Sequence, residues 1–181
     1  MLNRDNDPMP IQVSEELVNE VYEEWIGRGF PDYPKDLKWR QKEFNKLIKF
    51  DRSTLFKPRT KTVGSSAHGL SLAWSYMTHH WDIKCGTMKT PIEIWNDEEH
   101  LKKGIKKILS GTFFPKREHH MISILDMRAM LSRYSGTQVV SNFRPTAAAL
   151  LYDKFIEKES SLFGTDSGVV WDMSCGYGGR L

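Results

Sequence analysis

The chain has 181 residues and a mass of 21.0 kDa, with 39% hydrophobic and 27% charged residues. It is therefore long enough to bury a core, and its composition excludes a wholly disordered protein. The longest apolar run, residues 146–151, is far shorter than the ~20 residues that cross a bilayer. Residues 1–10 contain no apolar signal core. We expect a soluble cytoplasmic protein with no membrane partner.

The net charge is +3, but the positive charge gathers between Lys35 and Lys61, where ten basic residues accompany three acidic ones. Such an excess attracts phosphate groups, although a solvated helix face would also produce it. Within this stretch, residues 57–64 combine proline, glycine and three cations, which predicts a surface loop. We expect Lys57, Arg59 and Lys61 in this loop to contact nucleic acid.

Hydrophobic spacing predicts a mainly α domain over residues 1–135. A first amphipathic helix should follow Ser14 and end near Gly27 or Gly29. A second helix should carry four apolar residues on one face and most of the basic residues on the other; the four are Leu37, Phe44, Leu47 and Ile48. Further helices are expected from about Ser66, after Thr90-Pro91, from Asn96 to Gly111, and from Met121 to Leu131.

The pattern changes after residue 135. Residues 137–140 favour a short strand, residues 142–145 a turn, and Pro145 to about Glu157 a helix. The pattern of residues 169–181 predicts a buried parallel strand followed by a glycine-rich turn. A ligand would lie at the carboxyl end of this strand. The same glycines could instead only relieve a crowded turn. The order predicts the first elements of an α/β Rossmann-like domain at residues 136–181.

Two motifs in this second part resemble those of one family. The spacing Asp-x-x-x-Gly-x-Gly-Gly at residues 172–179 resembles the first motif of S-adenosylmethionine-dependent methyltransferases. Residues 141–146, SNFRPT, resemble the turn that precedes this motif in DNA amino-methyltransferases. Together, residues 136–181 resemble phage and bacterial enzymes that methylate the exocyclic amine of adenine or cytosine. The resemblance implies S-adenosylmethionine as cofactor, DNA as partner, and a bacterial or phage-infected cell.

The resemblance also implies roles for individual residues. Phe143, Pro145 and Thr146 would contact the methionine end of the cofactor, although Thr146 could instead only cap its helix and Phe143 only pack in the core. The wall under the methionine and ribose would be formed by Asp172, Ser174, Cys175, Gly176 and Tyr177. The helical domain, residues 1–135, would then be an accessory region that contacts DNA.

Other expected parts of such an enzyme are missing from the chain. No two of the eight prolines are adjacent, so the Pro-Pro-aromatic element that holds the target amine is absent and we assign no catalytic residue. The histidine pairs at 79–80 and 119–120 do not predict a metal site, because neighbours on a helix point about 100° apart. We expect the N-terminal part of a longer DNA methyltransferase, inactive by itself. The alternative is a non-catalytic phage-type protein that binds DNA or a host protein and keeps a relic methyltransferase tail.

Overall fold

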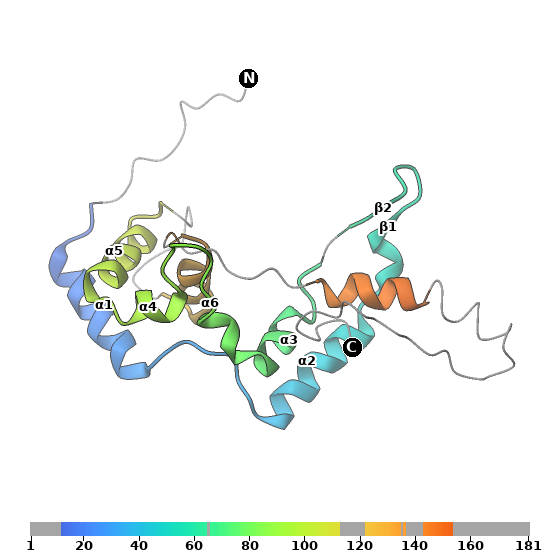
Figure 1. Cartoon of the computed structure of the whole chain (residues 1–181), viewed down its shortest axis with the longest axis horizontal. Helices are drawn as coiled ribbons and strands as arrows, with labels where there is room; N and C mark the ends of the chain where they lie inside the picture. The colour runs from blue at the N-terminus through green and yellow to red at the C-terminus, as the bar shows by residue number, and fades with distance from the viewer. Residues whose placement is uncertain (1–11, 65, 113–121, 135, 137–142, 154–181) are drawn as a thin grey trace, which may run out of the picture. The chain divides into compact units, whose positions relative to one another are not determined.

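The computed structural model describes residues 12–64, 66–112, 122–134, 136 and 143–153, and these residues are mainly helical. The chain divides into two compact units (Figure 1). Unit 1 comprises Met1–Asp32 and His79–Val140, and unit 2 comprises Tyr33–Thr78 and Ser141–Leu181. No Rossmann-like sheet is evident in the described residues. The strands expected near 137–140 and 169–171 lie outside them.

Unit 1 is a bundle of short helices around one apolar core. Its helices are α1 (Glu15–Arg28), α4 (Pro91–Trp95), α5 (Glu98–Leu109), α6 (Ile124–Ala129) and the π-helical turn η3 (Met130–Tyr134). The 3-10 turn η2 (Thr78–Trp81) comes before α4 in the chain. α5 packs against α1, α4 and η3. Its Leu101 and Ile105 are fully buried, together with Ile94 and Met127. The burial of these side chains from several helices provides the main stabilisation of the unit.

Local signals in the sequence explain where the helices of unit 1 begin and end. The Ser14 side chain accepts a hydrogen bond from the Leu17 amide at 3.2 Å and starts α1, which stops at Gly29 with φ of 81°. Thr90 and Glu93 form a reciprocal capping box at the start of α4. Asp97 caps α5 in the same way as Ser14 caps α1. These helices were expected from the sequence, and the structure confirms them.

Unit 2 is built from α2 (Leu37–Lys49), η1 (Arg52–Leu55), β1 (Phe56–Lys57), β2 (Thr62–Val63), α3 (Leu70–Tyr76) and helical residues 145–153. β1 and β2 are antiparallel, with Phe56 opposite Val63. Residues 57–64 therefore form most of a hairpin rather than the predicted loop. Lys61 adopts φ of 51° in the turn between the strands. The prediction that this segment is at the surface is confirmed, since both strands are exposed.

The structure confirms the helix α2, but its apolar face is largely exposed. None of its residues is buried, and Leu37 and Ile48 are 76% and 55% exposed. Leu47 is partly buried and lies against Gly69 at the start of α3. Periodicity identified the helix but not which apolar residues find a partner.

The predicted domain boundary at residue 135 remains a prediction, because most of residues 136–181 lie outside the described part. The structure adds that residues 143–153 belong to the same unit as residues 33–78. Among the described residues, no helix combines the length and apolar character needed to span a membrane.

Candidate functional site

The turn at residues 143–146 opens the helix of residues 145–153. The Arg144 carbonyl accepts hydrogen bonds from the amides of Ala147 and Ala148, at 3.0 and 3.1 Å, and so begins the helix. Thr146 lies within the first turn and does not cap the helix. Phe143 is 42% exposed, so it is not a core residue either. The structure therefore supports neither helix capping by Thr146 nor core packing by Phe143.

The Thr146 side chain is buried without a partner. The residue is 0% exposed, and its Oγ1 atom is the buried side-chain polar atom that has no hydrogen-bond partner in the described part of the chain. An unsatisfied buried hydroxyl costs about 1–3 kcal/mol, because the group loses its water and gains nothing in return. A polar ligand that forms a hydrogen bond with the Thr146 hydroxyl would remove this cost.

Two residues of unit 2 that the motif does not include hold this turn in place. Gly69, at φ of 82°, begins α3, and a Cβ built there would lie 2.9 Å from Pro145 Cβ and 3.1 Å from Leu47 Cδ1. Only glycine allows both this backbone conformation and so close an approach. Pro145 is buried in this contact. Sequence reasoning did not connect Gly69 or Leu47 with this turn, since no local pattern links them to residue 145.

The other end of the described helix is tied to η1. Arg52 Nε donates to Asp153 Oδ2 at 2.6 Å, and Asp51, just before η1, accepts from the Ser53 hydroxyl at 2.6 Å. The hydrogen bonds from the hydroxyl and amide of Ser53 hold the pKa of Asp51 below its ordinary value. The helix that carries Thr146 is thus anchored at Pro145 and at Asp153.

Three of the residues expected to bind the cofactor lie in the described part of the chain. Phe143, Pro145 and Thr146 lie in one turn, and the unsatisfied Thr146 hydroxyl suits a ligand with carboxylate or ammonium groups, such as the methionine end of S-adenosylmethionine. The remaining residues assigned to the cofactor lie outside the described residues; they are Asp172, Ser174, Cys175, Gly176 and Tyr177.

The three cations expected to contact nucleic acid lie on the hairpin. Lys57 belongs to β1, while Arg59 and Lys61 lie in the turn that follows it, and all three are exposed. None of them forms an ion pair within the described part of the chain. They lie at the surface, as the sequence predicted, although on a hairpin rather than a loop, and their contact with nucleic acid stays a prediction.

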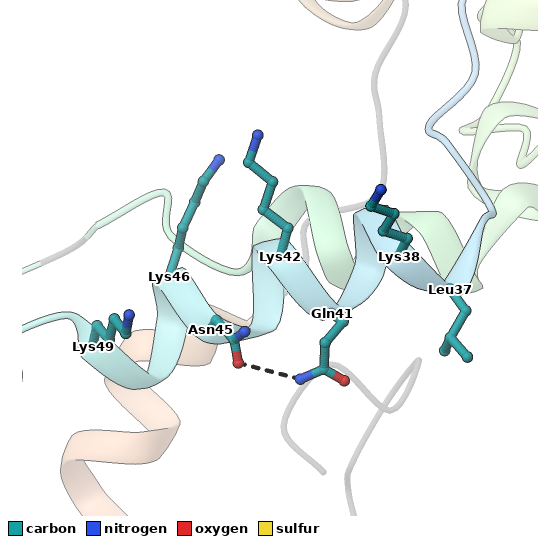
Figure 2. Close-up of a pocket in the computed structure, with 7 residues that line it drawn as sticks. All are labelled: Leu37, Lys38, Gln41, Lys42, Asn45, Lys46 and Lys49. Carbon is teal, nitrogen blue, oxygen red and sulfur yellow. Dashed lines mark hydrogen bonds between the residues drawn. The ribbon is translucent and has the colours of Figure 1, made fainter.

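A second basic surface lies on α2. The positive charge of this segment was evident from the sequence, but no role was predicted for its individual lysines. An open pocket of about 810 Å³ lies here, and its described lining residues, drawn in Figure 2, all belong to this helix. Four of them form what we call the lysine row: Lys38, Lys42, Lys46 and Lys49. Gln41 and Asn45 lie beside the row and are hydrogen-bonded to each other at 3.2 Å. The signal in the sequence was the recurrence of lysine at intervals of four, four and three.

Metal-binding chemistry finds no support in the described residues, where no group of three or more His, Cys, Asp or Glu residues could hold an ion.

Comparison with known proteins does not identify the chain. No family model matches it, and neither a curated protein nor a solved structure matches it. The function must therefore be argued from its own residues.

Proposed function

We propose that the chain belongs to an S-adenosylmethionine-dependent DNA amino-methyltransferase, and that the turn at residues 143–146 receives the methionine end of the cofactor. The two motifs at residues 141–146 and 172–179 support this proposal by their order and spacing. The observation that carries it is the buried Thr146 hydroxyl without a hydrogen-bond partner. It occurs at a position that the resemblance assigns to the cofactor.

The division of roles follows from the side chains. The Thr146 hydroxyl can donate to the cofactor carboxylate or accept from its ammonium, and Pro145 fixes the start of the helix that presents it. Phe143, half exposed beside the turn, offers an apolar surface to the methionine chain. The bound cofactor supplies the methyl group that passes to the exocyclic amine of a base extruded from duplex DNA. Because the 181 residues contain no Pro-Pro element, we expect them to bind the cofactor without transferring the methyl group.

Calorimetric titration of the full chain with S-adenosylmethionine tests the proposal. Thr146→Val removes the hydroxyl and keeps the shape of the side chain. It should weaken binding by about 10- to 100-fold, since a hydrogen bond to a charged group contributes about 1.5–3 kcal/mol. It should also leave the free energy of unfolding unchanged or higher, because an unsatisfied buried polar atom is removed.

Thr87→Val is the matched control, because Thr87 is exposed and lies in unit 1. It should not change cofactor affinity. Equal affinity of the native chain and the Thr146→Val variant would contradict the role of the hydroxyl. Absence of cofactor binding by the native chain would contradict the enzyme assignment.

The second candidate is a non-catalytic DNA-binding protein that keeps a relic methyltransferase tail. The exposed cations of the hairpin favour it, because phosphate contact by Lys57, Arg59 and Lys61 needs no cofactor. A chain that binds DNA but not S-adenosylmethionine would support this candidate.

A further inference from the structure

The lysine row on α2 is an ordered array of positive charge. At about 100° per residue, positions 38, 42, 46 and 49 fall within ~80° of one another around the helix axis. Three of the four residues, Lys38, Lys42 and Lys49, form no ion pair with any residue that the structure describes. Lys46 pairs with Glu43 at 2.5 Å, across the edge of the row. The pocket lining contains no acidic residue among the described ones. Among the described residues, the row is therefore a face of positive charge with one compensating acid, Glu43.

The other cation on this helix has a different task. Arg40 lies away from the row, where its guanidinium donates to the side chain and the carbonyl of Ser75, at 3.1 and 2.5 Å. It also lies over the Tyr76 ring, 3.8 Å from its centre. Arg40 thus attaches α2 to α3, and the lysine row faces away from this attachment. The structural role and the charged face are separate on the same helix.

A comparison with α5 shows that lysines on a helix of this chain can be paired with acids. α5 also carries four lysines, at positions 102, 103, 106 and 107. Two of them are paired with acids, Lys102 with Glu98 at 2.5 Å and Lys106 with Glu15. Acidic residues occupy the first turn of α5, whereas α2 has none there. Thus α5 has two lysines paired with acids, whereas α2 has one, Lys46, among the residues that the structure describes.

The dimensions of the row suit the backbone of a duplex. With a rise of 1.5 Å per residue, positions 38 to 49 span about 16 Å along the helix. One strand of duplex DNA presents a phosphate charge about every 3.4 Å of its axis, so this length corresponds to roughly five phosphates. No aromatic side chain is among the described residues that line the pocket, so the face offers no surface on which unpaired bases would stack.

We propose that the lysine row of α2 is a docking surface for the phosphate backbone of double-stranded DNA, and that it binds without regard to base sequence. The choice of DNA rests on the proposed function, in which DNA is the methyl acceptor. The inference goes further by naming the helix face that holds the duplex. It assigns the contact to the phosphates, because lysine ammonium groups position a protein on DNA, whereas base edges specify sequence.

The test measures the affinity of the full chain for a fluorescent duplex at several salt concentrations, without S-adenosylmethionine. The variant is Lys38→Gln, Lys42→Gln, Lys46→Gln and Lys49→Gln combined, since glutamine keeps the helix propensity of lysine. We expect affinity at 0.1 M salt to fall about tenfold or more, and the log–log salt slope to fall in magnitude by about 3 to 4, at ~0.9 per phosphate contact. A second duplex of unrelated sequence should give the same losses.

The control is the same fourfold replacement on α5, at Lys102, Lys103, Lys106 and Lys107. It changes the net charge by the same amount but leaves the lysine row intact. We therefore expect it to reduce the magnitude of the salt slope much less than the α2 variant does. The four Lys→Arg changes on α2 should retain binding, because the charges remain. Circular dichroism should show that each variant keeps its helices.

Equal losses from the α2 and α5 variants would overturn the proposal, because net charge alone would then explain binding. Unchanged DNA affinity of the α2 variant would also overturn it. So would an α2 variant that keeps DNA affinity but loses binding to phosphatidylserine vesicles, which would make the row a membrane surface. Cofactor titration of the same variants separates the two proposals, since the lysine row can bind duplex in a chain that binds no S-adenosylmethionine.

Discussion

The helices α2 and α5 are similar in length and in lysine content, yet the protein uses them differently. α5 has 12 residues and buries Leu101, Gly104, Ile105 and Ile108 in the core of unit 1. α2 has 13 residues and buries none. In the described part of the chain, Lys102 and Lys106 of α5 pair with acids, whereas Lys46 is the one member of the lysine row that does. Core packing and ion pairs with acids therefore occur together in α5, while α2 buries no residue and has a single paired lysine within the described residues.

The largest expected difference concerns the same substitution in the two helices. Ile105→Ala in α5 should lower the free energy of unfolding by about 2–5 kcal/mol, because the side chain is fully buried and its loss leaves a cavity. Ile48→Ala in α2 should change it by less than about 0.5 kcal/mol, since Ile48 is more than half exposed. Urea unfolding followed by circular dichroism measures both. Similar losses would mean that the face of α2 carrying Ile48 is covered in solution.

A second, smaller effect concerns how tightly α5 is packed. A Cβ at Gly104 would lie 2.4 Å from Met130 Sδ, and Met130 is fully buried. Gly104→Ala should therefore lower stability by about 1–3 kcal/mol through overpacking. Gly27 in α1 has nothing within 4 Å of such a Cβ. Gly27→Ala should raise stability by up to about 1 kcal/mol, because alanine favours a helix.

The same unfolding experiment decides this pair. A Gly104→Ala variant as stable as the native chain would show that the Met130 side chain moves aside without loss, and that α5 is less closely held than its contacts indicate.

The smallest effect is a pH dependence at the start of α5. The Lys89 ammonium, and after it the amide of His100, hold the pKa of Asp97 below its ordinary value. The stabilisation is therefore present above the ordinary aspartate pKa and is lost as the pH falls through the lowered pKa in the folded state. Lys89→Gln should raise the pKa of Asp97 towards its ordinary value, and NMR titration of the carboxyl carbon measures it.

Asp97→Asn keeps an acceptor for the His100 amide but does not titrate. The difference in stability between the native chain and this variant should shrink as the solution is acidified. A difference that stays constant from neutral pH to acid would exclude the carboxylate as the source of this stabilisation.

The sequence predicted the parts of the fold that depend on neighbours in the chain. Ser14 and Thr90 start helices as expected because a side-chain oxygen three residues away satisfies a free amide, which is a local requirement. The contact between Gly69 and Pro145 joins residues far apart in the chain, and no periodic pattern encodes it. The hairpin was missed because two-residue strands leave almost no alternation to detect.

The same limit applied to the candidate site. The resemblance brought out Thr146, but only three-dimensional packing reveals that its hydroxyl is enclosed and unsatisfied. In α2, the spacing predicted one apolar face but did not indicate that Phe44 and Ile48 on this face would remain exposed. Burial depends on the partner surface, and that surface comes from other segments.

The interleaving of the two units sets an order for folding during synthesis. Residues 33–78 emerge from the ribosome before unit 1 has received residues 79–140, and unit 2 lacks the helix at 145–153 until still later. At the synthesis rates of about 5–20 residues per second, α2 and α3 wait for several seconds for the segment that carries Pro145 and Thr146. During that interval Leu47 and Gly69 have no proline to cover them. We therefore expect unit 2 to complete its folding after unit 1, although residues 33–78 are synthesised before residues 79–140.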